Sequence, residues 1–359
     1  MIVRCCFVFI SLLFSLVAKA QIVFHDASVF PLLGKISEAT ETRYERLPAR
    51  LRDVTRPPVW HLGKNTAGLA IRFRTDSPRI SVRWENVNDF YCCGMNHMAP
   101  AGVKGLDLYC LENGVWTYVN TALPTAKKSE AIIMNAEKKE REFKLYLPLY
   151  DGIVSIEIGI DSLSFIAQPA VDLPVRNKPI VAYGTSILQG GCASRPGMAH
   201  TNILSRMLNR EVINLGFSGN GQLGYEIAEF MAESDPIMFI LDFMPNVNVQ
   251  QINEKTEIFY RILRDKHPDT PIVFIENPVF PRAAYNLNMQ EEVSRKNLAL
   301  NAVFNNLIAK NEKNIYLIPS EGKIGNDGEA TVDGIHYTDL GFLRYAEFLL
   351  PKINEIIHR

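Results

Sequence analysis

The spacing of apolar residues changes once along the chain, near residue 168, and this change constrains the fold more than any other feature. Before it, short runs alternate apolar and polar residues with a period of two: 69–74, 80–84, 106–109, 143–147 and 154–159. Such alternation is typical of antiparallel strands that have one face in a core and one in solvent. Several of them in succession predict an antiparallel β-sandwich over residues 21–167.

The second half has a different pattern, and it follows a proline-containing segment, 168–178, that we expect to be a linker. Short apolar, β-branched runs occur there at 179–183, 212–215, 237–241, 272–275 and 315–318. Stretches with helical spacing lie between or after them, at 201–208, 223–232, 252–266, 291–310 and 345–357. The alternation predicts a doubly wound α/β domain over 179–359, with a parallel sheet of about five strands. Its binding site should lie at the carboxyl ends of those strands.

Length and charge agree with a globular protein of two domains. The chain has 359 residues, and 38 basic residues face 39 acidic ones, which gives a formal net charge of −1. A chain with a net charge near zero lacks the excess of basic residues that a nucleic-acid binder needs on its surface. We therefore expect no nucleic-acid partner, and the sequence leaves the oligomeric state open.

Residues 1–20 have the features of a secretory signal peptide. Arg4 precedes an apolar run at 7–17, and Ala18-Lys-Ala20 supplies small residues for cleavage. The run is shorter than the ~20 residues that cross a bilayer, which favours cleavage over an anchor helix. We expect export to the periplasm or the cell exterior, with no membrane insertion after cleavage.

The exported chain would keep Cys92, Cys93, Cys110 and Cys192. Oxidising surroundings permit disulfides, and four cysteines allow three complete pairings. A bridge between the adjacent Cys92 and Cys93 would strain the peptide between them. We expect buried thiols or one bridge at most. The spacing of cysteines and histidines matches no zinc motif, so we expect no metal and no cofactor.

Polar residues follow the predicted parallel strands where a site should form. Ser186 lies just beyond the first strand and could act as a nucleophile, with His336 as its base and Asp333 as the residue that orients the imidazole. The oxyanion would be held by the backbone N–H groups of Ser186 and Gly219 and by the side-chain amide of Asn246. Without those partners, Ser186 would more simply cap the following helix.

Other polar residues near these positions have less specific interpretations. Arg195 and His200 are weak candidates for substrate binding; a solvated arginine and a packed histidine are the simpler alternatives. Asp339 is expected to cap the final helix, and Cys192 to be a structural thiol. The long segment 86–98 is expected to pack over the catalytic face.

The four blocks that contain Ser186, Gly219, Asn246 and Asp333/His336 resemble those of the SGNH (GDSL-type) hydrolase superfamily, from residue 179 to the end of the chain. The sandwich half contains Gly105-Leu-Asp-Leu-Tyr109, which is similar to the GxDLY motif of the N-terminal domain in one exported esterase family of this type. Two positions depart from the superfamily: Thr185 stands where an Asp is usual, and Met244-Pro-Asn246-Val replaces Gly-x-Asn-Asp. Gly-x-Ser-x-Gly is absent, because Leu188 follows Ser186 by two, which disfavours an α/β-hydrolase.

The resemblance implies a flavodoxin-like hydrolase domain and a secreted serine esterase that works through an acyl-enzyme. Its substrates would be small-molecule or glycan esters, with O-acetyl groups on carbohydrates the first choice. A broad lysophospholipase or thioesterase would use the same triad. From a different class, a non-catalytic carbohydrate-binding protein could occupy the same scaffold.

Overall fold

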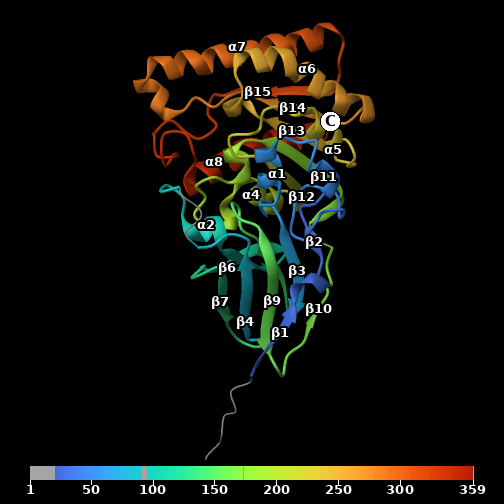
Figure 1. The fold of residues 1–359 in the computed structure, drawn as a ribbon, viewed down its shortest axis with the longest axis vertical. Helices are drawn as coiled ribbons and strands as arrows, with labels where there is room; N and C mark the ends of the chain where they lie inside the picture. The colour runs from blue at the N-terminus through green and yellow to red at the C-terminus, as the bar shows by residue number, and fades with distance from the viewer. Residues whose placement is uncertain (1–20, 91–94, 173, 359) are drawn as a thin grey trace, which may run out of the picture.

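The computed structural model describes residues 21–90, 95–172 and 174–358, so the predicted signal peptide and Cys92 and Cys93 lie outside the described residues. The molecule is elongated, with antiparallel sheets toward one end and a helix-covered parallel sheet toward the other (Figure 1). Among the described residues, no helix is long and apolar enough to cross a membrane.

The antiparallel part is built from two sheets. In β4 (Arg79–Asn86), Ile80, Val82 and Trp84 are buried in the core between the sheets, whereas Arg83 is exposed. One sheet has the order β1 (Ile22–Asp26), β9 (Ile153–Asp161), β4 and β7 (Lys128–Asn135). The other has the order β10 (Ile166–Ala167), β3 (Ala70–Thr75), β8 (Arg141–Tyr146), β5 (Leu106–Glu112) and β6 (Val115–Ala122), with β2 (Leu32–Leu33) paired to β3.

The parallel sheet has five strands in the order β12 (Arg210–Gly216), β11 (Val175–Gly184), β13 (Met238–Asp242), β14 (Ile272–Ile275) and β15 (Ile315–Ile318). In chain order this is 2-1-3-4-5, the flavodoxin-like arrangement, whose switch point lies between its first and third strands. The predicted fold class is confirmed. β11 begins at Val175, inside the segment for which the sequence predicts a linker.

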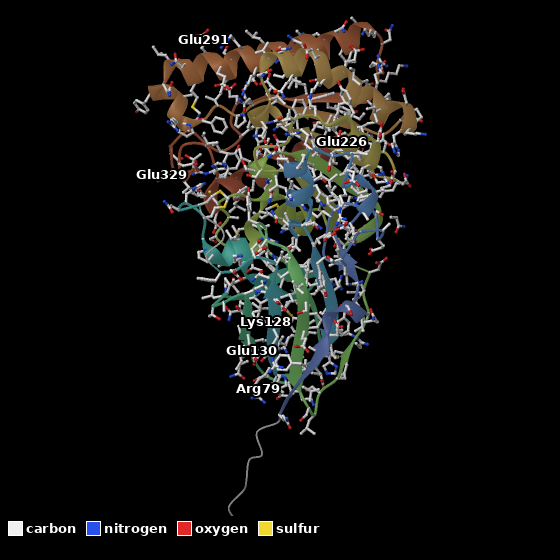
Figure 2. All side chains as sticks on the ribbon, viewed as in Figure 1. Arg79, Lys128, Glu130, Glu226, Glu291 and Glu329 are labelled. Carbon is white, nitrogen blue, oxygen red and sulfur yellow. The ribbon has the colours of Figure 1, made fainter. Side chains whose placement is uncertain are left out.

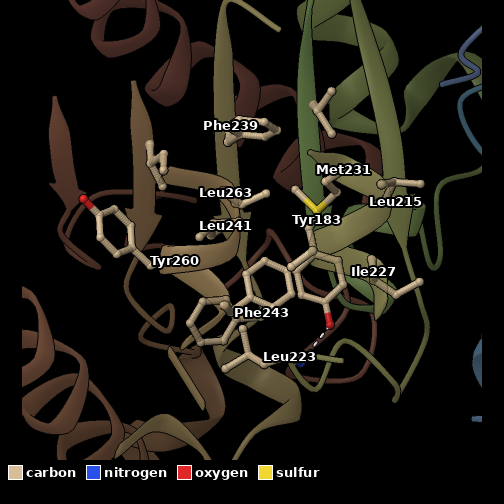
Figure 3. Packing of buried hydrophobic residues seen from close by; sticks show 14 of the residues in the cluster. Tyr183, Leu215, Leu223, Ile227, Met231, Phe239, Leu241, Phe243, Tyr260 and Leu263 are labelled. Carbon is tan, nitrogen blue, oxygen red and sulfur yellow. Dashed lines mark hydrogen bonds between the residues drawn. The ribbon is translucent and has the colours of Figure 1, made fainter. Parts of the chain in front are cut away.

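Helices cover both faces of the parallel sheet. Figure 3 shows one face, where the Tyr183 hydroxyl accepts a hydrogen bond of 2.8 Å from the Leu223 N–H. The Tyr183 ring packs against that of Phe259, with 5.0 Å between their centres. The helices of this face are α5 (Tyr225–Met231), α6 (Val249–Lys266) and α7 (Leu287–Ala309). Those of the other face are α3 (Ser186–Gln189), α4 (His200–Met207) and α8 (Asp339–Ile357).

Short helices complete the chain between these elements. They are α1 (Pro57–Gly63), α2 (Pro100–Lys104), and the 3-10 turns η1 (Ala27–Val29), η2 (Ala49–Leu51), η3 (Pro196–Met198), η4 (Met244–Asn246) and η5 (Pro281–Tyr285). Charged side chains lie on the outside toward both ends, for example Glu291 on α7 and Glu130 on β7 (Figure 2).

The two halves share buried surface. Leu47, Leu51 and Trp60, which precede β3, pack in the same core cluster as the strands of the parallel sheet. Arg46 is buried beside them, and its Nη1 donates to the carbonyl oxygens of Asn214 and Gly216 at 3.0 and 2.9 Å. The N-terminal half therefore stabilises the strand whose carboxyl end leads into the Gly219 loop.

Candidate active site

Ser186 is the first residue of α3, directly beyond β11. Thr185, and not Ser186, caps this helix: its Oγ1 accepts the N–H of Ile187 at 3.3 Å. The helix ends after one turn at Gly190, which has a φ of +103°. Glycine adopts this left-handed conformation readily because it has no Cβ. With the capping role taken by Thr185, the Ser186 hydroxyl can serve another partner.

That partner is His336. Its Nε2 lies 2.9 Å from Ser186 Oγ, and its Nδ1 lies 2.8 Å from Asp333 Oδ2. An Nδ1–H that donates to the carboxylate leaves the Nε2 lone pair to accept the serine O–H. The structure thus brings Ser186, His336 and Asp333 into one hydrogen-bonded line, although 150 positions separate the serine from the histidine.

A tight turn fixes the histidine relative to its carboxylate. Asp333 Oδ1 accepts the backbone N–H groups of Ile335 and His336 at 3.0 and 2.7 Å. Partial burial by itself raises the pKa of Asp333, but the hydrogen bonds from the His336 ring and from the backbone outweigh it and lower this pKa to about 2. Asp333 is therefore a carboxylate at neutral pH.

The predicted oxyanion donors lie on loops that are tied to α3 and to one another. Asn246 Oδ1 accepts the N–H of Gly221 at 3.1 Å, which leaves the Asn246 amide nitrogen as the donor for a ligand. Gln189 Oε1 accepts the N–H of Ser218 at 3.0 Å. Gly219 is exposed with a φ of +66°, and within the described chain no heavy atom other than those of Gly219 and its two chain neighbours lies within 4 Å of where its Cβ would be. Space for a reacting group is therefore present beside this loop.

His97 is a residue near the triad that the sequence analysis misses. It comes from a turn at 95–98 in the N-terminal half, and its ring centre lies 5.4 Å from that of His336. Its Nε2 is 4.0 Å from Asp333 Oδ2. Its neighbour Met98 packs against Cys192. The described part of segment 86–98 thus lies beside the triad; no local sequence signal marks His97, because its partners are distant in the chain.

Arg195 contacts the N-terminal half. Its Nη1 donates to Asp107 Oδ2 and to the Tyr109 hydroxyl, both at 2.7 Å, and its guanidinium carbon lies 3.9 Å from the Tyr118 ring centre. Asp107 is fully buried. The GLDLY strand is therefore an interface with the hydrolase half, and its polar residues do not form a solvated face.

His200, the other weak candidate for substrate binding, is a packed histidine. Its side chain is 1% exposed and its ring lies against those of Phe342 and Tyr345. Burial lowers the pKa of His200 to about 3, so the imidazole is neutral. Both weak candidates are held by contacts within the protein.

The expected role of Asp339 as a helix cap is wrong. Thr338 caps α8 by accepting the N–H of Gly341 at 3.2 Å, and Asp339 is the first helical residue. Asp339 instead accepts the N–H of Ser194 at 2.9 Å, which anchors the segment after α3. Its position in the first turn also suits the positive end of the helix dipole.

Cys110 and Cys192 are buried free thiols. Burial, and then the negative charge of Asp333, raise the pKa of Cys192 to about 12, so it is protonated at neutral pH. Its sulfur nevertheless forms a group with ring nitrogens of His97 and His336, and these three atoms lie within 4.8 Å of one another. The sequence contains no zinc-type motif for these three residues, because they come from three distant segments.

Comparison with known proteins agrees with this geometry. Residues 177–354 match the GDSL-like lipase/acylhydrolase family, and residues 22–166 match the GxDLY family, described as the N-terminus of SGNH-hydrolase-type esterases. No curated protein matches the chain.

Solved structures are similar over nearly the full length. A protein from Bacteroides ovatus described as a GDSL-like lipase is 38% identical, with a TM-score of 0.89 over 94% of this chain and 98% of that one. The salicylyl-acyltransferase SsfX3 from a tetracycline biosynthetic pathway is 17% identical, with a TM-score of 0.75 over 94% and 97%. A family two carbohydrate esterase from Cellvibrio japonicus is 14% identical, with a TM-score of 0.60 over 95% and 99%. The last two share the fold.

The match to the Bacteroides ovatus protein and the two family matches cover both halves of the chain. The chain therefore belongs to the GDSL-like lipase/acylhydrolase (SGNH hydrolase) family, as an ester-hydrolysing enzyme that has a GxDLY domain before its hydrolase domain.

Proposed function

We propose that the enzyme removes short acyl groups, O-acetyl groups above all, from carbohydrates after its export from the cytoplasm. The observation that carries the proposal is the continuous line of hydrogen bonds from Ser186 through His336 to Asp333, at 2.9 and 2.8 Å. This is the arrangement that makes a serine hydroxyl nucleophilic at neutral pH.

The reaction uses each of these groups twice. His336 Nε2 takes the proton while Ser186 Oγ bonds to the ester carbonyl carbon, and Asp333 stabilises the imidazolium that results. The oxyanion accepts hydrogen bonds from the N–H groups of Ser186 and Gly219 and from the Asn246 amide. Collapse breaks the bond to the alkoxy oxygen, which receives the proton from His336. Water then attacks the acyl-enzyme by the same steps and releases the acid.

Packing beside the nucleophile supports a small acyl group. The Tyr150 hydroxyl donates to the Ser186 carbonyl oxygen at 3.1 Å, so this ring adjoins the nucleophile. Tyr150 packs against a cluster of Met98, Val103 and Cys192, which are at most 8% exposed. Apolar side chains that already fill one another's space leave little room for a long acyl chain.

Two further features support the substrate class and the compartment. The fold is shared with family two carbohydrate esterases from Cellvibrio japonicus and Clostridium thermocellum, the latter solved in complex with cellohexaose. Residues 1–20 have the composition of a signal peptide. If they are removed on export, mass spectrometry of the protein recovered from the producing cells should give Gln21 as the first residue.

The enzymatic proposal is tested with p-nitrophenyl acetate and octanoate, using the wild type, Ser186→Ala and a control, Ser194→Ala. Ser194 is an exposed serine that contacts Asp339 and not His336. We expect the wild type and the control to prefer acetate, and Ser186→Ala to be inactive. Release of acetate from a panel of acetylated polysaccharides would then identify the natural ester. Glycan binding without hydrolysis of any ester would instead indicate the carbohydrate-binding alternative.

A further inference from the structure

We infer that His97, Cys192 and His336 form a binding site for a thiophilic divalent cation of the Zn²⁺ type, and that an ion bound there switches off the esterase by occupying its base. The binding part of this inference stands on geometry alone. The inhibitory part rests on the proposed function, because it requires His336 to act as the base.

The three ligand atoms already converge. The Cys192 sulfur and one ring nitrogen from each histidine lie within 4.8 Å of one another. Tetrahedral Zn²⁺, with bonds of about 2.3 Å to sulfur and about 2.0–2.1 Å to nitrogen, holds such atoms roughly 3.3–3.6 Å apart. Closing the difference takes movements of about 1 Å, and His97 can make them because Met95 and Asn96 in its turn are exposed.

A second observation shows that this group lacks a partner. His97 Nε2 is buried, and in the described part of the chain it has no hydrogen bond. The Asp333 Oδ2 atom lies 4.0 Å from this nitrogen, beyond hydrogen-bond reach. A buried polar atom without a hydrogen bond costs about 1–3 kcal/mol. Coordination of a cation would satisfy it.

Cys192, whose sulfur belongs to this group, has an unusual backbone conformation. Its φ is +73°, in the left-handed region that a residue with a Cβ seldom adopts. Strained residues of this kind are concentrated at functional sites, where the surrounding structure maintains them. The strain thus agrees with a role for the thiol beyond filling space.

The donor set selects the class of ion. One thiolate and two imidazoles suit Zn²⁺ and leave a fourth position for water, whereas Mg²⁺ and Ca²⁺ require oxygen ligands. Binding transfers the thiol proton of Cys192 to the buffer and leaves a sulfur–metal bond. Asp333 can keep its hydrogen bond with His336 Nδ1, which is the usual support of a metal-bound histidine.

The switch follows from competition for one lone pair. His336 Nε2 must accept the proton of Ser186 during catalysis, and it lies 2.9 Å from Ser186 Oγ. An ion that binds His336 through Nε2 takes this lone pair, and His336 then cannot accept the proton. Hydrolysis and metal binding therefore exclude each other, and removal of the ion restores the base.

The experiment uses the full chain as the wild type, as Cys192→Ser, and as a matched control, Cys110→Ser, which removes the other described buried thiol. Equilibrium dialysis measures bound Zn²⁺, and hydrolysis of p-nitrophenyl acetate is measured with and without Zn²⁺ or Mg²⁺. We expect Cys192→Ser to keep measurable esterase activity without metal and to lose one bound Zn²⁺. It should also need at least 10-fold more Zn²⁺ for half inhibition, while the control behaves as the wild type and Mg²⁺ inhibits neither.

Equal Zn²⁺ binding by the wild type and Cys192→Ser would overturn the site. Loss of binding in Cys192→Ser with a wild-type esterase that Zn²⁺ does not inhibit would overturn the switch. If the wild type hydrolyses no ester, the proposed function fails, while dialysis still decides the site. If Cys192→Ser does not fold, cobalt replaces zinc in the wild type and in His97→Gln. A thiolate-to-cobalt absorption band that weakens in the variant supports the site, and a band unchanged in the variant contradicts it.

Discussion

At the scale of single residues, two adjacent side chains at the end of β11 have separate tasks. Thr185 is buried and caps α3, and Ser186 contacts His336. A capping residue before Ser186 fixes the first turn of the helix, and with it the direction of the serine hydroxyl. Thr185 supplies this cap although the superfamily usually has Asp here.

Asn246 offers a test of charge stabilisation in the transition state. Its Oδ1 accepts a hydrogen bond from the Gly221 N–H, which orients the side-chain amide. Asn246→Ala therefore removes both the proposed donor to the oxyanion and this hydrogen bond. We expect kcat to fall by about 10²–10³ with a small change in KM, because the oxyanion forms only in the transition state. Steady-state kinetics with p-nitrophenyl acetate measure this. A variant with unchanged kcat would remove Asn246 from the oxyanion hole.

His200 should make stability depend on pH. Burial lowers its pKa to about 3, whereas an imidazole in an unfolded chain titrates near 6.5. Below about pH 6.5 the unfolded state binds a proton that the native state does not bind until about pH 3. Stability that is fully present above pH 6.5 is therefore lost as the pH falls. Between pH 7 and 5 the loss is about 2 kcal/mol.

Urea unfolding of the wild type and of His200→Leu at pH 7 and pH 5 measures this contribution. The wild type should lose about 2 kcal/mol more than the variant over this interval. The matched control, His61→Gln, replaces an exposed histidine. Its free energy of unfolding should fall between pH 7 and pH 5 by as much as that of the wild type. If His200→Leu loses as much unfolding free energy between pH 7 and pH 5 as the wild type, His200 is not the source of the pH dependence.

At the scale of elements, β5 and the segment after α3 are joined by one buried carboxylate. Asp107 Oδ2 accepts from Arg195 Nη1 at 2.7 Å and from the Gly197 N–H at 2.8 Å. The other oxygen accepts from the Thr121 hydroxyl at 2.5 Å. Burial raises the pKa of Asp107, and the positive charge of Arg195 opposes that rise. The GLDLY strand thus holds the start of the hydrolase fold in position.

Loss of this arginine should be costly. Arg195→Met leaves the fully buried Asp107 without its cation, and we expect a loss of about 2–3 kcal/mol, below the value for a completely buried pair because the Arg195 side chain is 20% exposed. Urea unfolding measures it. Arg83→Met, which removes an exposed pair with Glu130, should lose less than about 1 kcal/mol. Equal losses in the two variants would contradict this role for Arg195.

The elements also show what the sequence can predict. Strands β11 to β15 are recognisable because both faces of the parallel sheet are covered, so each consists largely of apolar residues. β6 is missed because most of its residues are exposed or half-buried and its pattern is mixed. α8 begins at Asp339 and not at Tyr345, because the Thr338 cap allows an additional turn and a half that apolar spacing does not reveal.

At the scale of the whole molecule, the proximity of Ser186, His336 and Asp333 is predictable and the surroundings of these residues are not. The carboxyl ends of parallel strands meet at one edge of the sheet, so Ser186 and the Asp333–His336 turn could be placed together from topology. His97 and the partner of Arg195 depend on how the sandwich packs against the hydrolase half. Contacts of that kind have no local pattern in the sequence.

The shared core predicts that the two halves unfold together. Leu47, Leu51 and Trp60 pack with the strands of the parallel sheet, so separation of the halves would expose apolar surface on both. All three tryptophans precede residue 117, whereas the long helices follow residue 186. Tryptophan fluorescence is therefore weighted toward the N-terminal half and its contact with the parallel sheet, whereas the helical signal of far-ultraviolet circular dichroism is weighted toward the hydrolase half. Their urea midpoints should coincide, and two separate midpoints would show independent domains.

The central claim is that Ser186 is a nucleophile activated by His336. Its most direct test is peptide mass mapping after reaction with a fluorophosphonate, an ester-like reagent that bonds to activated serines, in the wild type and in His336→Ala. We expect a single label on the peptide that contains Ser186, and a rate of labelling that falls on the order of 10³-fold in the variant. A label on another serine, or labelling of Ser186 that is equally fast without His336, would contradict the account.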